Sequence, residues 1–234
     1  MKITSINNKI IKDTAKLHQK KYRDISNQFL VEGYHLFEEA SKVGNIITIF
    51  TTDEAIKGDK VIYVSDQVLE KLAQTKTPQP VLAVCTKIAN EELSDKILIL
   101  EQIQDPGNLG TLMRSALAFG FKTIVLDNTV DIYNDKVLRS TQGAIFKLNI
   151  IHENTLEFIK RNKDYKFYGT KLYGQPISNI NKEGKIAIIL GNEGSGVSEM
   201  VLSHTTANFT IEMAETESLN VGVAGSIIMH YITN

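Results

Sequence analysis

A glycine-rich turn follows an apolar run in the stretch IAIILGNEGSGVSEM, residues 186–200. Such a turn lets the backbone approach a ligand closely, or bend where a Cβ atom would clash. Gly191 and Gly196 have the spacing of a phosphate-binding loop, but Val197 occupies the position of the lysine that neutralises the phosphates. Glu193 would also repel a polyphosphate. The turn therefore suits an uncharged or cationic ligand, unless it is a strand-to-helix turn without a ligand.

Two other chemistries are excluded for the same turn. A dinucleotide-binding fingerprint needs a third glycine, which is absent after Gly194 and Gly196, and it needs a strand–helix–strand unit that does not begin here. A serine nucleophile needs the frame G-x-S-x-G, whereas Ser195 has Glu193 and Val197 at the two glycine positions. We therefore expect neither a dinucleotide nor a covalent serine intermediate.

A second stretch, DPGNLGTLMRSALAFG at residues 105–120, combines a turn signal with a long cation. Asp105 and the Pro-Gly pair after it predict a turn, and Asn108 is the expected N-cap of the following helix. Arg114 would project from the second turn of this largely apolar helix. A solvated or ion-paired arginine is the usual interpretation of such a residue, and a functional cation is the alternative.

A third stretch, IEMAETESLNVGVAGSIIMHYI at residues 211–232, places Gly222 and Gly225 inside a helical pattern. Each glycine costs about 1 kcal/mol relative to alanine, so bare backbone must be needed there. Either a ligand or another segment comes close, or the helix packs tightly against a neighbour. Ser218 is the expected cap of this helix, and Asn220 in its first turn could orient a ligand or substrate.

Composition limits the other kinds of site. The chain has 234 residues, of which 42% are hydrophobic and 23% charged, so we expect two modest domains. A single cysteine, Cys85, lies in an apolar run, and the five histidines show no ligand spacing, so we expect no metal site. The chain has neither an apolar run of membrane-spanning length nor a secretory signal, which predicts a cytoplasmic protein.

The positive charge of the chain is concentrated at one end. The formal net charge is −1, but residues 1–23 carry +6 and the remaining residues −7. Four lysines in this segment recur at helical spacing, so one helix would align their ammonium groups in a stripe that could face a phosphate backbone. A solvated helix face is the alternative interpretation. The four are Lys9, Lys12, Lys16 and Lys20.

Apolar runs alternate with helical stretches along the whole chain. Residues 1–90 indicate a small layered α/β domain, and the polar segment KIANEELSDK, residues 87–96, is the expected linker. In the second half, long crossovers between short strands favour a mainly parallel sheet. Its strands are expected at 97–101, 123–126, 146–151, 167–171 and 186–190, and its helices at about 109–119, 153–162, 197–203 and 218–232.

The three stretches resemble one family when they are taken together. In order and at comparable separation, DPGNLGTLMRSALAFG, IILGNEGSGVS and SLNVGVA resemble the three motifs of the SpoU (TrmH) family of RNA ribose 2′-O-methyltransferases, within the SPOUT superfamily. This resemblance covers residues 95–234. FLVEGYHLFEEA, preceded by KIIKDTAKLHQKKYR, is similar to the ribosomal-protein-like substrate-binding domain that many members carry. The expected domains are therefore 1–92 for RNA binding and 95–234 for methyl transfer.

The resemblance implies a fold, a cofactor and an assembly. The fold is α/β, with a mainly parallel sheet and a C-terminal deep trefoil knot (SPOUT), preceded by a small α/β RNA-binding domain. The cofactor is S-adenosyl-L-methionine, which has no phosphates and carries a sulfonium cation, as the glycine-rich turn permits. Members are usually homodimers. The implied cofactor-binding residues are Leu190, Gly191, Asn192, Gly196, Ile211, Met213, Leu219 and Asn220.

The implied reaction is attack of a ribose 2′-hydroxyl on the sulfonium methyl group. Arg114 matches the family's catalytic arginine, and we expect it to stabilise the developing alkoxide rather than to act as a base. The other implied catalytic residues are Asn108, Glu193, Ser218 and Asn220. The expected RNA-binding residues are Lys9, Lys12, Lys16, Lys20, Lys21, Arg23 and Arg139, with Ser140 and Gly143 as further candidates on the substrate side.

The sequence departs from the family pattern in the third motif. Glu212 stands where a proline is usual, no glycine follows Met213, and Gly222 stands where a serine is common. The expected substrate is structured RNA, with ribosomal RNA of the 23S type favoured over transfer RNA. An RNA-binding ribosome-assembly factor without catalysis is the alternative from a different class. Resistance to a ribosome-targeting antibiotic is a third hypothesis, which differs only in the nucleotide modified.

Overall fold

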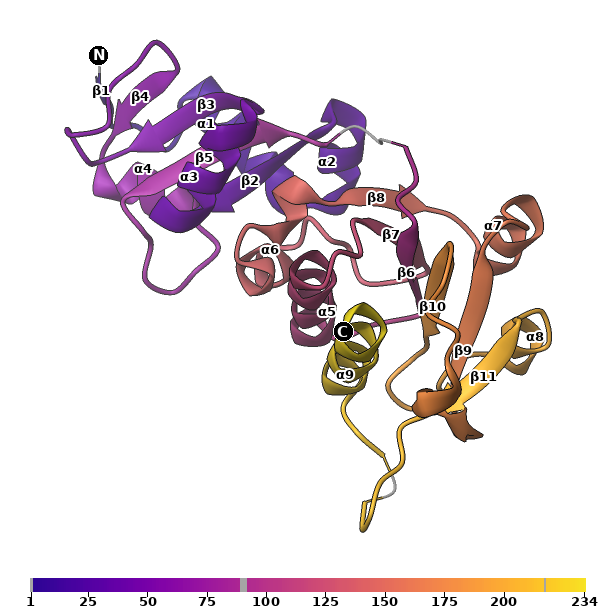
Figure 1. Cartoon of the computed structure of the whole chain (residues 1–234). Helices are drawn as coiled ribbons and strands as arrows, with labels where there is room; N and C mark the ends of the chain where they lie inside the picture. The colour runs from indigo at the N-terminus through magenta and orange to yellow at the C-terminus, as the bar shows by residue number, and fades with distance from the viewer. Residues whose placement is uncertain (1, 89–91, 217) are drawn as a thin grey trace. The chain divides into compact units, whose positions relative to one another are not determined.

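The computed structural model describes residues 2–88, 92–216 and 218–234, which form two compact units (Figure 1). The first unit comprises Met1–Ile88 with Asp131–Phe146, and the second comprises Ala89–Val130 with Lys147–Asn234. Residues 89–91 of the expected linker lie outside the described residues. The predicted second domain contained the segment Asp131–Phe146, whereas by its contacts this segment groups with the first unit.

The first unit is a mixed sheet with helices packed on it, in the strand order β1-β4-β3-β5-β2. The pairs β1/β4 and β3/β4 are parallel, and β5 is antiparallel to both β2 and β3. The strands are β1 (Lys2–Ile3), β2 (Gln28–Glu32), β3 (Ile46–Thr51), β4 (Val61–Val64) and β5 (Val81–Thr86). The helices are α1 (Lys9–Ala15), α2 (Lys20–Ser26), α3 (Tyr34–Val43), α4 (Asp66–Leu72) and α6 (Asp135–Thr141), with a 3₁₀ turn η1 (Lys16–His18).

The lysine-rich segment is not one continuous helix. Helix α1 ends at Ala15, the 3₁₀ turn η1 follows, and Gln19 has extended backbone dihedrals, with φ −100° and ψ 132°, before α2 begins. The predicted single stripe is therefore wrong, because Gln19 changes the direction of the helix axis. The five lysines themselves are exposed: Lys9, Lys12, Lys16, Lys20 and Lys21.

Arg23 was predicted to contact RNA, and its burial contradicts this. The residue is only 5% exposed, and its guanidinium donates to the carbonyl oxygens of Leu17 and His18, at 2.8 Å each, and to the carboxylate of Asp131. Asp131 belongs to the segment that joins the first unit from the middle of the chain. Arg23 is therefore a structural residue that connects α2 and η1 to this segment.

We expect Arg23→Ala to reduce the free energy of unfolding by about 3–5 kcal/mol, because it leaves the partly buried Asp131 carboxylate and two carbonyls without their donor. Urea unfolding measures this change. Lys20→Ala is the matched control, since it removes an exposed ion pair to Asp24 that contributes at most about 1 kcal/mol. Equal effects of the two variants would contradict the assignment.

The second unit is a parallel sheet in the strand order β11-β9-β10-β6-β7-β8, and every strand pair in it is parallel. The predicted parallel α/β fold is therefore confirmed, although no strand was predicted at β11; the trefoil knot stays a prediction. The strands are β6 (Lys96–Glu101), β7 (Thr123–Asp127), β8 (Asn149–His152), β9 (Lys166–Pro176), β10 (Ile186–Leu190) and β11 (Ala207–Thr210). The helices are α5 (Pro106–Ala118), α7 (Thr155–Arg161), α8 (Glu199–Leu202) and α9 (Val221–Thr233), with 3₁₀ turns η2 (Ala144–Lys147) and η3 (Ile177–Asn179).

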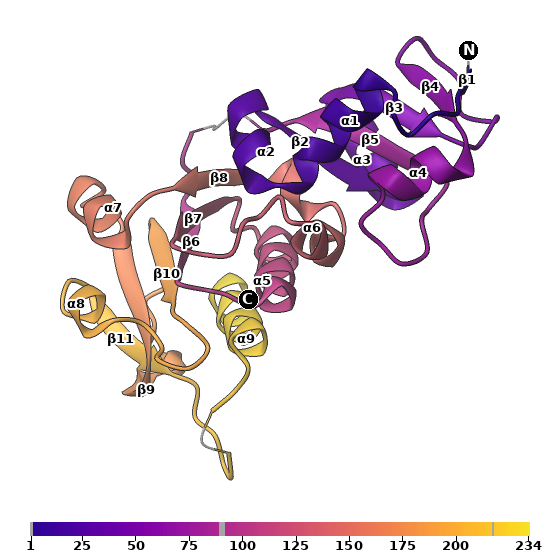
Figure 2. The same ribbon diagram turned by 180° about the vertical axis from the view of Figure 1, so that it is seen from behind.

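Helices cover both faces of this sheet. Figure 2 shows α5 and α9 side by side, with α7 and α8 on the opposite side of the strands. Alternate strand residues point to opposite faces, so Ile97 and Ile189 meet Phe158 of α7 and Val201 of α8 in one core cluster. Strands that are buried on both faces have continuous apolar sequences, and for this reason ILIL and IAIIL could be predicted as strands from the sequence.

Two helix caps differ from the predicted ones. Asp105 caps α5, because Pro106 takes the first helical position and the Asp105 carboxylate accepts the Asn108 N–H at 2.8 Å. Asn220, rather than Ser218, caps α9 by accepting the N–H groups of Gly222 and Val223. Because Asp105 caps α5, the side-chain amide of Asn108 is available for contacts with other side chains.

Candidate functional site

The candidate site lies at the carboxyl ends of β6 and β10, which are neighbours in the sheet. Strands β7 and β8 lie beyond β6, and β9 and β11 lie beyond β10, so the order of the chain reverses between the two. Ligands of open parallel sheets bind at such a switch point, outside the carboxyl ends of the strands. The loops that follow β6 and β10 carry the first and second motif.

Glu193 in the glycine-rich turn connects these two loops. One carboxylate oxygen accepts the Asp105 N–H and the Asn108 side-chain amide, both at 3.1 Å, and the other accepts the Gln104 N–H at 3.4 Å. The turn after β10 is thus held against the start of α5. Both oxygens of the Glu193 carboxylate thus accept hydrogen bonds from donors of the protein itself.

Asn108 extends this connection to the third motif. Its side-chain oxygen accepts a hydrogen bond from the Asn220 amide at 2.8 Å, while its amide nitrogen donates to Glu193. Asn220 in turn uses its own oxygen to cap α9. The chain of hydrogen bonds Glu193–Asn108–Asn220 therefore joins three segments that are 85 and 112 residues apart in sequence.

The environment of Glu193 favours its charged form. Burial alone would raise the pKa of Glu193, but the hydrogen bonds from Asn108 and from the N–H groups of Asp105 and Gln104 outweigh burial, and the pKa lies below the usual glutamate value. Glu193 is therefore an acceptor that stays ionised at neutral pH. A proton donor in the reaction would need the opposite shift.

This lowered pKa predicts a pH dependence of stability. Because the folded-state pKa of Glu193 lies below the unfolded-state value of about 4.3, its contribution is complete above that value and is lost as the pH falls through the folded-state pKa. We expect the difference in free energy of unfolding between wild type and Glu193→Gln to be constant above about pH 5 and to shrink at lower pH. Urea unfolding across this range measures it, and a difference that grows on acidification would contradict the assignment.

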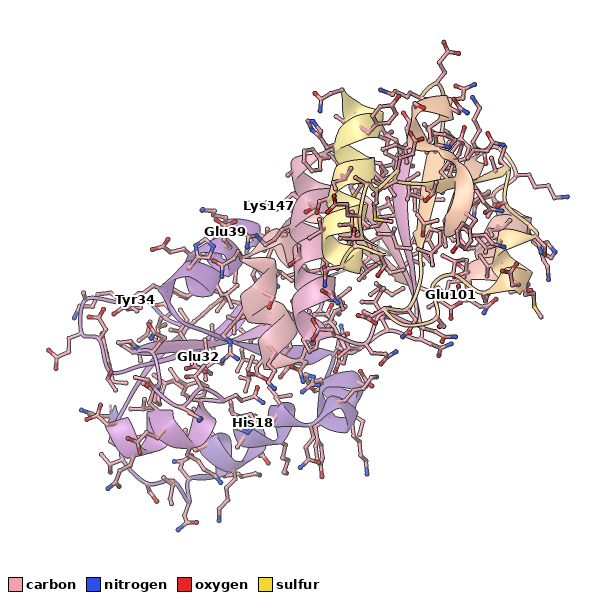
Figure 3. The ribbon with its side chains drawn as sticks, turned by 90° about the horizontal axis from the view of Figure 1, so that it is seen from below. His18, Glu32, Tyr34, Glu39, Glu101 and Lys147 are labelled. Carbon is pink, nitrogen blue, oxygen red and sulfur yellow. The ribbon has the colours of Figure 1, made fainter. Side chains whose placement is uncertain are left out.

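Asn192 and Glu101 fix the two ends of the glycine-rich turn. The Asn192 oxygen accepts the Gly194 N–H at 2.9 Å, and its amide donates to the Gln102 carbonyl at 3.0 Å. The buried carboxylate of Glu101, which is labelled in Figure 3, accepts both the N–H and the hydroxyl of Ser198, at 2.9 and 2.7 Å. The turn is therefore rigidly attached to the end of β6.

The glycines of α9 are explained by helix packing. A Cβ at Gly225 would overlap the side chains of Leu112 and Leu190, and one at Gly222 would lie 3.3 Å from Thr111. Helices α5 and α9 thus approach each other closely, and the hydroxyls of Ser115 and Ser226 hydrogen-bond between them at 2.7 Å. Of the two predicted reasons for these glycines, tight packing is the one that the structure supports.

A cavity of about 610 Å³ opens beside the hydrogen-bonded motifs. All eight residues predicted to bind the cofactor line it, and so do Glu193 and Ser218 from the predicted catalytic set. Sequence reasoning missed another wall, Thr170–Tyr173 in β9, where the only signal was the pair of glycines at 169 and 174. The other missed lining residues are Gly194, Ser195, Val197, Glu199, Leu202, Phe209, Thr210, Val221, Ala224 and Ile228.

Two predicted cations lie elsewhere. Arg114 is exposed on α5, does not line the cavity, and has no hydrogen bond or ion pair among the residues that the structure describes. Arg139 lies on α6 in the first unit, where it pairs with Asp135 at 3.0 Å. Among the residues that the structure describes, Arg114 is thus a cation without a partner, whereas Arg139 is partly neutralised.

Neither a metal centre nor a membrane span is apparent in the described parts of the chain. Within residues 2–88, 92–216 and 218–234, the fold brings together no group of three side chains suited to holding a metal ion. In the same residues, none of the helices has both the length and the apolar character needed to cross a bilayer.

Comparison with protein families gives two matches along the chain. The model of the SpoU rRNA Methylase family matches residues 95–230, and that of the MRM3-like substrate binding domain matches residues 8–83. Among individual proteins, the 23S rRNA (guanosine(2553)-2′-O)-methyltransferase RlmP of Bacillus subtilis (strain 168) is 38% identical, and the alignment covers 98% of this chain and 98% of the relative.

Solved structures resemble the chain over nearly its whole length. The AdoMet-bound rRNA methyltransferase from Sinorhizobium meliloti is 27% identical and superposes with a TM-score of 0.87, covering 99% of this chain and 97% of that one. The SpoU methyltransferase AviRb from Streptomyces viridochromogenes is 20% identical, with a TM-score of 0.84 over 97% and 96% of the two chains. At that identity the second likeness shows the fold alone.

Proposed function

Because the chain belongs to the SpoU rRNA methylase family, we propose that it transfers a methyl group from S-adenosylmethionine to a ribose 2′-hydroxyl of ribosomal RNA. The RlmP relative acts, by its name, on a guanosine ribose of 23S rRNA, which supports 23S rRNA as the substrate class. The matched substrate binding domain supports an RNA partner for the first unit.

One observation supports this function most strongly. Three motifs that are distant in sequence meet through the hydrogen bonds Glu193–Asn108–Asn220 beside a single cavity. A turn that only connected β10 to the next helix would not need these polar contacts between three segments. The arrangement orients side chains at the rim of a ligand site, which is how a preformed active site lowers the cost of binding its reactants.

The cavity suits the proposed cofactor in size and chemistry. Its volume of about 610 Å³ is in the range of small-molecule sites. Gly191 approaches Gly196 so closely that a Cβ would overlap backbone atoms, so a cradle of bare backbone borders the cavity. A carboxylate at Glu193 and apolar walls, with no lysine in the turn, fit a cationic ligand that lacks phosphates.

The bound cofactor supplies an electrophilic methyl group on a sulfonium. We propose that Asn108 and Asn220 orient the ribose beside the cavity, and that Glu193 keeps both amides in place. Arg114 has no partner in the described part of its chain, so its guanidinium is available to hold a substrate phosphate and to stabilise the developing alkoxide. A phosphate oxygen or water takes the hydroxyl proton, because a guanidinium is not deprotonated in proteins.

The RNA-binding part of the proposal rests on exposed cations of the first unit. Five exposed lysines lie on α1, η1 and α2, although Lys16 and Lys20 also form ion pairs with Asp13 and Asp24. Such lysines attract a phosphate backbone without reading its sequence. Arg139 remains a candidate contact from α6.

We also propose that two copies of the chain associate as a homodimer. Arg114 does not line the cavity of its own chain, and Val223 and Ile227 leave apolar surface on α9, being 48% and 37% exposed. A second copy that covers α9 would bury these side chains and could bring a cation to a neighbouring site.

The decisive experiment is transfer of labelled methyl from S-adenosylmethionine to RNA from cells that lack this protein. Ribosomal RNA and transfer RNA are tested separately, with Arg114→Ala alongside. Label in 23S rRNA that is lost in the variant would support the proposal. Label in transfer RNA alone would show that transfer RNA, and not ribosomal RNA, is the substrate. Cofactor binding without label calls for a pre-ribosomal particle as the substrate, and absence of cofactor binding would favour a non-catalytic RNA-binding factor.

A further inference from the structure

The pairing of strand β9 with β11 shifts register by five residues next to the cavity. Asn208 of β11 pairs with Gly169, but the next residue, Phe209, pairs with Gln175. The five residues Thr170–Gly174, here called the β9 excursion, therefore stand opposite a single step of the neighbouring strand. Four of them, Thr170–Tyr173, line the cavity.

Glycines at both ends hold the excursion close to β11. A Cβ at Gly174 would lie 2.7 Å from the Asn208 carbonyl oxygen, and one at Gly169 would overlap the side chains of Asn208 and Leu202. At Gly174 the overlap is with backbone, so any other residue type would push the two strands apart; at Gly169 the side chains of Asn208 and Leu202 would have to move. The excursion is thus built into the sequence and is not a loose loop.

Two hydroxyl groups fix the path of the excursion between its ends. Thr170 donates to the Ile189 carbonyl of β10 at 3.1 Å, and Thr210 donates to the Leu172 carbonyl at 3.0 Å. Both hydroxyls donate to backbone carbonyls, so they fix the path of the main chain at Thr170 and Leu172. Tyr173 therefore lies between two fixed points of the backbone, Leu172 and Gly174.

The excursion exposes apolar surface at the cavity. Leu172 is 56% exposed and Tyr173 is 91% exposed, although both line the cavity wall. Within the described residues, the Tyr173 ring has neither a stacking partner nor a hydrogen bond. An aromatic ring held in water at the edge of a ligand site can contribute binding energy once the ligand covers it.

The two sides of the cavity carry different residues, and this difference assigns the ring to one part of the ligand. Glu193 and Asn220 belong to the hydrogen-bonded motifs, whereas Leu172, Phe209 and Ile211 come from β9 and the end of β11 beside the excursion. The polar groups near the excursion include Lys171 and Glu199, which pair with each other at 2.8 Å. S-adenosylmethionine has a flat heteroaromatic adenine at one end and a charged amino acid at the other. The apolar side chains beside the excursion suit the adenine, and the hydrogen-bonded motifs suit the charged end.

We propose that the Tyr173 ring stacks on the adenine of the bound cofactor, so that the β9 excursion forms the outer wall of the adenosine subsite. This inference rests on the proposed function, because it takes S-adenosylmethionine as the ligand. Stacking of a base on an aromatic side chain predicts that Tyr173→Ala weakens cofactor binding about tenfold. Tyr173→Phe keeps the ring and should bind as the wild type does.

A fluorescence experiment tests the contact directly, because the chain contains no tryptophan. In Tyr173→Trp the single indole reports on its own environment, and S-adenosylhomocysteine should quench it in a saturable manner. Tyr34→Trp is the matched control, because Tyr34 is an exposed tyrosine of the first unit that does not line the cavity. The fluorescence of this variant should not change when S-adenosylhomocysteine is added. Quenching of Tyr173→Trp by RNA but not by S-adenosylhomocysteine would overturn the proposal.

Calorimetry with S-adenosylhomocysteine separates this inference from the proposed function. If the wild type binds and Tyr173→Ala binds equally well, the stacking contact is absent even though the cofactor site is present. If Tyr173→Trp is quenched but no RNA is methylated, the stacking contact stands and the proposed reaction fails. A wild type that does not bind the compound would overturn both.

Discussion

Replacing Arg114 by alanine is expected to lower the kcat of methyl transfer about 10²–10³-fold, the usual effect of removing one group that stabilises developing charge in a transition state. Arg114 has no partner among the described residues of its own chain, so its charge is available to the substrate. Steady-state methylation of ribosomal RNA at saturating RNA and cofactor measures the change in kcat.

The same substitution should leave cofactor affinity unchanged, because Arg114 does not line the cavity. Arg161→Ala is the matched control: Arg161 is an exposed arginine on α7, on the opposite face of the sheet, and it pairs with Glu153. We expect this control to retain wild-type kcat. An unchanged kcat in Arg114→Ala would contradict the role proposed for this residue, and weakened cofactor binding would move it into the cofactor site.

Arg114→Lys distinguishes two forms of the same role. A lysine retains the positive charge but cannot present the planar, two-pronged donor of a guanidinium to a phosphate. Partial activity would indicate simple charge stabilisation. Complete loss with intact RNA binding would indicate that the bidentate geometry is needed to place the phosphate and the ribose together.

Elements with strong apolar patterns were predictable from the sequence, and short or irregular ones were not. The runs at β6 and β10 are buried on both faces and stand out as strands. Strand β11, four residues long with the sequence ANFT, has no such pattern, and helix α6 at Asp135–Thr141 was overlooked although Asn134 caps it. The β9 excursion depends on pairing with β11, which no local pattern contains.

The site residues were predictable as types but not as partners. Asn108, Glu193 and Asn220 could be named from the resemblance of their motifs to the family. Their hydrogen bonds could not be predicted, because they form only when the folded sheet brings together residues that are 85 and 112 positions apart in sequence. Arg23 was misassigned because its neighbours in sequence are exposed lysines. Its buried partner, Asp131, is 108 residues away.

Gly191→Ala is expected to have the largest effect on the cofactor site. Its Cβ would overlap the backbone of Gly196 and the Val197 nitrogen, and backbone atoms cannot turn aside as the end of a side chain can. Opening the turn costs about 3 kcal/mol by analogy with overpacked cores, which corresponds to about a 100-fold weaker Kd for S-adenosylhomocysteine. Calorimetric titration measures the affinity.

Gly194→Ala separates this steric effect from a general need for glycine in the turn. Its Cβ would lie 3.5 Å from the Asn192 side-chain oxygen, an ordinary contact, and we expect near-wild-type affinity. If both variants bind equally well, the turn can open without cost, and the close approach of Gly191 to Gly196 does not shape the site. If only Gly191→Ala weakens the binding of S-adenosylhomocysteine, bare backbone at this one position forms the wall of the cavity. This would explain why a turn without the phosphate-binding lysine still needs its first glycine.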